Sequence, residues 1–119
     1  MAEEIKNAKN VKGFQPRAVV YAKKLDEDFS EAVAGFYSSV WEEKEGGISK
    51  KDKHLMVFAI ACSNQKISSA VKILQRLKKY DVSSQEIKDV MMLAAWTSGI
   101  QNFTNFTPKI LEEMERLEF

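Results

Sequence analysis

The chain has 119 residues, 45% of them hydrophobic and 29% charged, and its 18 basic and 17 acidic side chains give a formal net charge of +1. This length suits one compact domain, so we expect a single domain over residues 1–119. The charge balance argues against nucleic-acid binding, which requires a basic face or run. The nearest candidate, ISKKDKH, carries Asp52 in its middle.

The sequence also argues against a membrane or secreted protein. Its longest apolar run, residues 55–62, is far shorter than the ~20 residues that span a bilayer. The polar start MAEEIKNAKNVKG lacks the apolar core of a secretory signal, and we expect residues 1–14 to form a flexible lead. A single cysteine cannot form an internal disulfide, so we expect a reducing, cytoplasmic location.

The first half of the chain predicts two helices. Pro16 suits the first turn of a short helix over residues 16–25. Acidic residues then open a longer amphipathic helix, and the pair Gly46 and Gly47 is expected to end it. The apolar residues of this second helix recur at helical spacing: Phe29, Val33, Phe36, Tyr37 and Val40.

The second half predicts four more helices. Ser49 and Asp52 form an acidic variant of a capping box before the apolar run, which should be a buried central helix or a subunit interface. A helix over residues 65–81 follows, and Ser83 and Glu86 form a second capping box. The last helix, within residues 102–119, has Pro108 near its first turns. Six helices with short connections predict an all-α domain.

Four consecutive segments carry a family resemblance: LDEDFSEAVAGFYSSVWEE, ISKKDKHLMVFAIA, the helix that follows, and VSSQEIKDVMMLAAWTSG. In order and spacing, over residues 16–114, they resemble the carboxymuconolactone decarboxylase and alkylhydroperoxidase D-like family. The resemblance implies a six-helix alkylhydroperoxidase D-like bundle. Because relatives commonly form trimers built into hexamers, it also implies a homotrimer or homohexamer.

The peroxidase branch of that family has a Glu followed at twelve positions by Cys-x-x-Cys-x-x-x-His at a helix start. The helix N-terminus lowers the thiol pKa, the second Cys resolves the oxidised first, and Glu and His relay protons. When HLMVFAIA and SSQEI are both aligned with the family, no gap is needed between them. In this alignment His54 stands at the Glu position, Lys66 and Ser69 stand at the two Cys positions, and Ile73 stands at the His position. With one cysteine in the chain, a Cys-x-x-Cys peroxidase within one subunit is excluded.

The chemistry-bearing residues each have a structural and a functional interpretation. Cys62 is read as a small buried core residue, with a single-cysteine peroxidatic role as the alternative. His54 is a hydrogen-bonded helix residue or an acid/base group, and Lys66 is a solvated side chain or a cation facing a vestigial pocket. Ser69 is read as a packing residue rather than a nucleophile. One histidine cannot make a multi-histidine metal site, so we expect neither metal nor cofactor.

Two functional hypotheses follow. The first is an oligomeric scaffold or small-ligand-binding protein whose catalytic site has degenerated. The second is an enzyme of the same fold with decarboxylase- or isomerase-like acid/base chemistry at His54 and Lys66. We favour the first because all four motif positions are substituted together, whereas a close approach of His54 to Lys66 or Ser69 would favour the second.

Apolar surface supports self-association. The run at residues 55–62 and the segment WTSGIQNFTNF supply more apolar surface than a monomer of this size readily buries. We interpret the large aromatic residues mainly as core or subunit interface; they are Trp41, Trp96, Phe103 and Phe106.

Overall fold

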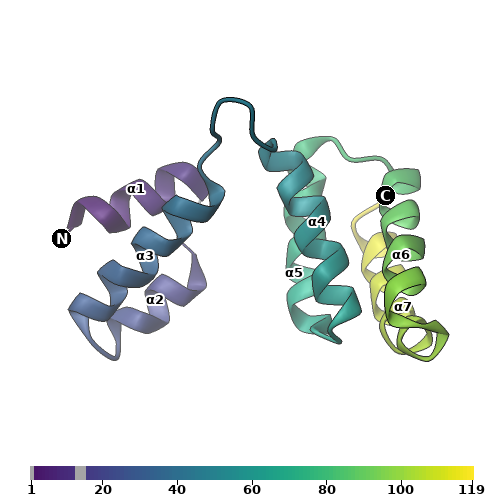
Figure 1. Ribbon diagram of the computed structural model, residues 1–119. Coiled ribbons are helices and arrows are strands. Elements are labelled where there is room, and N and C mark those ends of the chain that lie inside the picture. The colour runs from purple at the N-terminus through teal and green to yellow at the C-terminus, as the bar shows by residue number, and fades with distance from the viewer. Residues whose placement is uncertain (1, 13–15) are drawn as a thin grey trace. The chain divides into compact units, whose positions relative to one another are not determined.

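The computed structural model describes residues 2–12 and 16–119, which form seven α-helices and one short 3-10 helix (Figure 1). The all-α class is therefore confirmed. The sequence predicted six helices, and the additional one is α1 (Ala2–Lys12), within the stretch expected as a lead. The chain divides into two compact units, residues 1–50 and 51–119. A single domain over the whole chain stays a prediction.

The first unit contains α1, α2 (Arg17–Lys23) and α3 (Glu27–Trp41), with α1 and α2 both packed on α3. Pro16 precedes α2 as its N-cap, and the Asp26 carboxylate caps α3 by accepting a hydrogen bond of 2.9 Å from the Phe29 amide. The core of this unit is small: the buried Ala8, Val19 and Ala34, with Ile5, Val33 and Tyr37 packed around them. The polar helix α1 is stabilised by packing on α3 rather than by a strong apolar stripe of its own.

Helix α3 ends earlier than the glycine pair predicted. Its last residue is Trp41, and Glu42 is already extended at φ −64°, ψ 130°. Three acids in the next four positions explain this end, because carboxylates are unfavourable at the negative C-terminus of a helix. Gly46 nevertheless takes a left-handed conformation, φ +76°, in the turn that follows.

The second unit contains α4 (Lys50–Ser63), α5 (Ile67–Leu77), the 3-10 helix η1 (Lys78–Tyr80), α6 (Ser84–Ser98) and α7 (Ile100–Arg116) (Figure 1). Short turns connect these helices, and α7 packs against both α5 and α6. Gln65, before α5, bonds to Asn102 near the start of α7, and Lys78, after α5, bonds to the Glu118 carbonyl beyond its end. Helices α5 and α7 therefore run parallel, as the second and fourth helices of an up-and-down bundle.

The core of the second unit draws on every helix in it. Its largest fully buried side chains are Phe58, Leu74, Leu77, Ile87, Phe106 and Ile110. The predicted capping box at the start of α6 is present, with Ser83 and Glu86 bonded to each other's amides. Helix α7 begins at Ile100, earlier than expected, so the exposed Pro108 lies in its interior rather than near its first turns.

Candidate functional site

Cys62 lies in the last turn of α4 and is completely buried. It belongs to the main core cluster beside Phe58 and Leu74. Burial raises the pKa of its thiol from the ordinary value of 9.0 to about 12, because the surrounding apolar groups cannot solvate a thiolate. A thiol in this setting is neither reachable nor ionised at neutral pH, unlike the cysteines of redox sites.

His54 lies near the beginning of the same helix and is only 2% exposed. Its ring is 4.8 Å from the ring of Tyr80, centroid to centroid, with 32° between the planes. Tyr80 ends η1, so this contact joins the start of α4 to the segment that follows α5. His54 therefore contributes to packing at this end of the bundle.

Lys66 and Ser69 lie at the start of α5. Lys66 is the N-cap residue, its side chain is exposed, and its amide donates a 2.8 Å hydrogen bond to the Ala61 carbonyl. Ser69 is also exposed, and the spacing of three residues puts the two side chains on one face of the helix. Ile73, on the same face, is half-buried and packs against the core.

The structure brings Lys66 and Ser69 together but separates them from His54. Lys66 precedes α5, whereas His54 stacks on Tyr80, which follows it. Along α4, the seven residues from His54 to Ala61, whose carbonyl accepts the Lys66 amide, correspond to about 10 Å. His54 is buried against Tyr80, whereas Lys66 is exposed at the α4–α5 turn, and no contact joins the two side chains.

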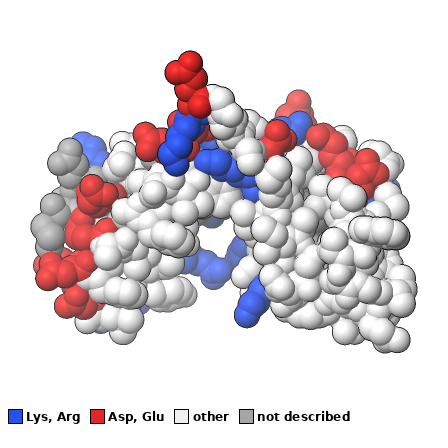
Figure 2. Space-filling view, in the orientation of Figure 1, with Lys and Arg blue, Asp and Glu red and all other residues white. Residues whose placement is uncertain are grey.

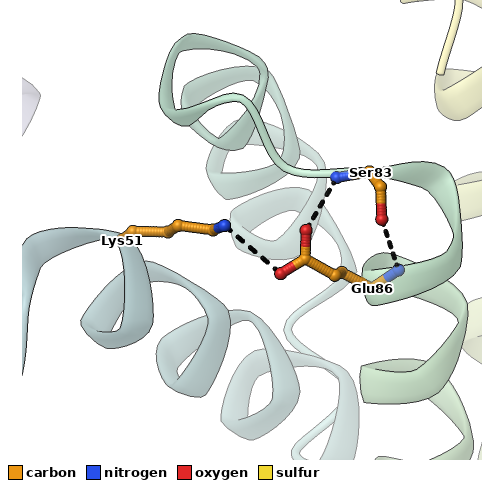
Figure 3. Close-up of polar contacts among 3 residues, drawn as sticks. All are labelled: Lys51, Ser83 and Glu86. Carbon is orange, nitrogen blue, oxygen red and sulfur yellow. Dashed lines mark hydrogen bonds and ion pairs between the residues drawn. The ribbon is translucent and has the colours of Figure 1, made fainter.

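A polar contact that the sequence did not reveal joins the starts of α4 and α6 (Figure 3). Lys51 Nζ lies 3.3 Å from Glu86 Oε2, while Glu86 Oε1 accepts a 3.0 Å hydrogen bond from the Ser83 amide. The Ser83 amide, and after it Lys51, lower the pKa of Glu86. The capping box was readable from the Ser-x-x-Glu spacing, but nothing in the sequence pairs it with Lys51, which lies in another helix.

A second network ties the α4–α5 turn to α7. Asn102 Nδ2 donates hydrogen bonds to the Cys62 carbonyl at 3.0 Å and to Ser98 Oγ at 2.7 Å, and the Gln65 side chain donates to Asn102. Gln65 has a left-handed backbone, φ +59°, which costs free energy for a residue other than glycine. The network anchors this turn through the backbone carbonyl of Cys62, the residue that carries the buried thiol.

The predicted aromatic residues divide between core and surface. Trp41 is 9% exposed and lies under Lys12 Nζ, which is 3.5 Å from the ring centroid. Phe106 is fully buried and meets Phe103 edge to face at 5.6 Å. Trp96, by contrast, is 87% exposed on α6.

Trp96 is part of an exposed apolar surface where α6 meets α7, which we name the α6–α7 corner. It consists of Met92, Leu93, Trp96 and Ile100, each more than half exposed. Residues 90–108 contain no charged residue. Figure 2 shows the same region as a largely uncharged surface at the lower end of the second unit, where Figure 1 places the turn between α6 and α7. Contiguous exposed apolar surface of this kind marks interaction sites.

Helix α4 combines a buried face with an exposed apolar one. His54, Phe58, Ala61 and Cys62 face the core, while Met56 and Ile60 are at least half exposed. The apolar run at residues 55–62 therefore contributes some side chains to the core and others to the surface.

Neither a metal site nor a membrane span is evident in the part of the chain that the structure describes. There, no three His, Cys, Asp or Glu residues gather in a way that could hold a metal ion. Residues 2–12 and 16–119 likewise contain no helix with the length and apolar content needed to cross a bilayer.

Comparison with known proteins gives a family and no individual relative. Neither the curated proteins nor the solved structures include a match to this chain. The sequence model of the carboxymuconolactone decarboxylase family matches residues 27–108, which is well over half of the chain. That match begins in α3, extends through the segment of His54, Cys62, Lys66 and Ser69, and ends within α7. The chain therefore belongs to the carboxymuconolactone decarboxylase family.

Proposed function

We propose that this protein is a family member without peroxidase chemistry, which acts as a self-associating scaffold or small-ligand-binding protein. One observation carries the proposal: its only thiol, Cys62, is completely buried and has a pKa of about 12. The thiolate is the species that attacks a peroxide, and at neutral pH about one Cys62 in 100,000 would be ionised. A single unpaired cysteine also supports a cytoplasmic, reducing location.

The burial of Cys62 also weighs against a single-cysteine peroxidase. Such an enzyme forms a sulfenic acid that an external thiol must reach and reduce. Cys62 has no exposed surface through which peroxide or a second thiol could approach.

The acid/base alternative receives less support because its two groups lie apart. A general acid or base must come within hydrogen-bond reach of the proton it moves, but His54 is buried against Tyr80 whereas Lys66 is exposed, and no contact joins them. Ser69 and Lys66 are both exposed to solvent, and no hydrogen bond joins their side chains.

A thiol titration combined with a peroxide-consumption assay tests the proposal. In the native protein we expect Cys62 to resist a thiol reagent at neutral pH and to react fully once the chain is unfolded in denaturant. We expect no peroxide turnover above the buffer rate, and the same result from Cys62→Ala. Peroxide turnover that the native protein supports and Cys62→Ala loses would refute the proposal.

Self-association forms the second half of the proposal, as a homotrimer or homohexamer. It is supported by the α6–α7 corner, where Trp96 and Ile100 are 87% and 68% exposed. Interface cores are depleted in charge and enriched in Trp and Met, as this corner is.

A further inference from the structure

A groove of about 340 Å³ lies between α5 and α7 in the second unit. Its α5 side is made by Ile67, Ser68, Val71 and Lys72. Ile67 and Val71 are half-buried and pack against the core, so they form an apolar floor, while Lys72 is exposed at the edge. This volume lies at the small end of the range for ligand sites, which suits one short molecule.

The α7 side of the groove carries four charges that largely cancel. Arg116 Nε donates to Glu113 Oε1, and Lys109 Nζ lies 4.0 Å from Glu112 Oε2. Each acid is thus paired with a base on its own helix. No hydrogen bond or ion pair joins the side chain of Lys72 to another residue that the structure describes. The groove therefore has one positive charge in excess.

The groove lies on a different face of α5 from the positions that correspond to the peroxidase motif. Successive helical residues are about 100° apart around the axis. Lys66, Ser69 and Ile73 fall within about 60° of one another, and the four groove residues are centred about 160° away from them. A ligand in the groove would therefore not occupy the degenerate motif site.

We propose that this groove binds a small amphiphilic monocarboxylate. Its aliphatic chain would lie on Ile67 and Val71, and its carboxylate would lie beside Lys72 and Lys109. No side chain caps the first turn of α5, so the backbone amides there add to the positive potential. A ligand with two negative charges is disfavoured, because Glu112 and Glu113 lie at the same rim. The site lies within one chain, so it does not depend on the self-association proposed above.

Titration of the full-length, isotopically labelled protein with sodium octanoate, followed by NMR, tests this inference. We expect saturable shifts centred on the amides of residues 67–72 and 109–116. Lys72→Gln should raise the dissociation constant about threefold to fivefold, as expected for an exposed charge pair. Glu112→Gln should lower it, because Lys109 loses its competing partner.

Matched controls separate anion recognition from general apolar binding. Lys88→Gln removes an exposed lysine on α6 outside the groove and should leave the dissociation constant unchanged. Octan-1-ol, with the same chain and no charge, should bind more weakly than octanoate. Equal binding of octanol, an unchanged constant in Lys72→Gln, or shifts centred on the α6–α7 corner would overturn the inference. A monomeric mass or peroxide turnover would count against the proposed function and leave this result unaffected.

Discussion

The raised pKa of Cys62 has a consequence for stability at alkaline pH. Below the ordinary thiol pKa of 9.0, the group is protonated in both the folded and the unfolded chain. Between 9.0 and about 12 the unfolded chain releases the proton and the folded chain retains it. The free energy of unfolding should therefore fall as the pH rises through this window.

Cys62→Ala isolates that effect. At about pH 8 the variant should be less stable by about 1 kcal/mol, because a buried sulfur is replaced by a small cavity. At about pH 10.5 the order of stability should reverse, since thiol ionisation in the unfolded state costs the unmodified chain about 2 kcal/mol and the variant nothing. Urea unfolding of both proteins at the two pH values measures this difference in the free energy of unfolding. A difference that is the same at both would contradict a buried, un-ionised thiol.

Asn102 is the residue whose removal should most loosen the α4–α5 turn. It bonds to the Cys62 carbonyl, Ser98 Oγ and the Gln65 side chain. Asn102→Ala should lower the free energy of unfolding by about 1 to 3 kcal/mol, because a partly buried carbonyl loses its donor. Amide hydrogen exchange should quicken around residues 62–66. Asn105→Ala, an exposed asparagine on the same helix, is the matched control and should change neither quantity.

At the scale of elements, the start of α6 depends on a local cap and on a contact from α4. Ser83→Ala should lower the free energy of unfolding by about 1 kcal/mol, the usual cost of losing an N-cap. Lys51→Met should cause a smaller loss that disappears at high salt, since the ion pair with Glu86 is solvent-exposed.

Salt dependence distinguishes the contribution of the Ser83 cap from that of the ion pair between Lys51 and Glu86. The Ser83→Ala effect should persist in concentrated salt, because a hydrogen bond to a helix amide is hardly screened. Lys88→Met, which removes an exposed lysine elsewhere on α6, is the control for net charge. A Lys51→Met effect that is independent of salt would show that Lys51 acts through packing rather than charge.

Helix starts were easier to predict than helix ends. Asp26, Pro16 and Ser83 each lie at a predicted start and act as N-caps. Helix α3 ends at Trp41 rather than at the predicted Gly46, because the acidic run after Trp41 is unfavourable at the negative end of a helix. Helix α1 was missed for a related reason: its sequence has no strong apolar stripe, and it forms against α3, a contact that local patterns do not contain.

At the scale of the whole molecule, the α6–α7 corner should determine the mass of the protein in solution. We expect sedimentation at micromolar concentration to give a trimer or hexamer. Trp96→Lys should shift the protein to a smaller species with little change in helix content, because Trp96 is 87% exposed and contributes little to the core of one chain.

Leu111→Lys is the matched control for that variant. Leu111 is an apolar side chain, 48% exposed, farther along α7 and outside the corner. The Leu111→Lys substitution should leave the mass of the protein in solution unchanged. A monomeric mass for the unmodified protein would contradict self-association, and equal effects of both substitutions would contradict the role of the corner.

The sequence by itself determined the all-α class, most helix starts, the family and the absence of a second thiol, because periodicity, caps and residue counts are local or additive properties. Only the tertiary structure decided the chemistry of the candidate residues. Burial sets the thiol pKa of Cys62, and packing buries His54 against Tyr80 while it leaves Lys66 exposed. The groove at Lys72 and the contact of Lys51 with Glu86 likewise depend on which helices pack together. Solvation and distance between side chains arise from packing, and no local pattern in the sequence encodes them.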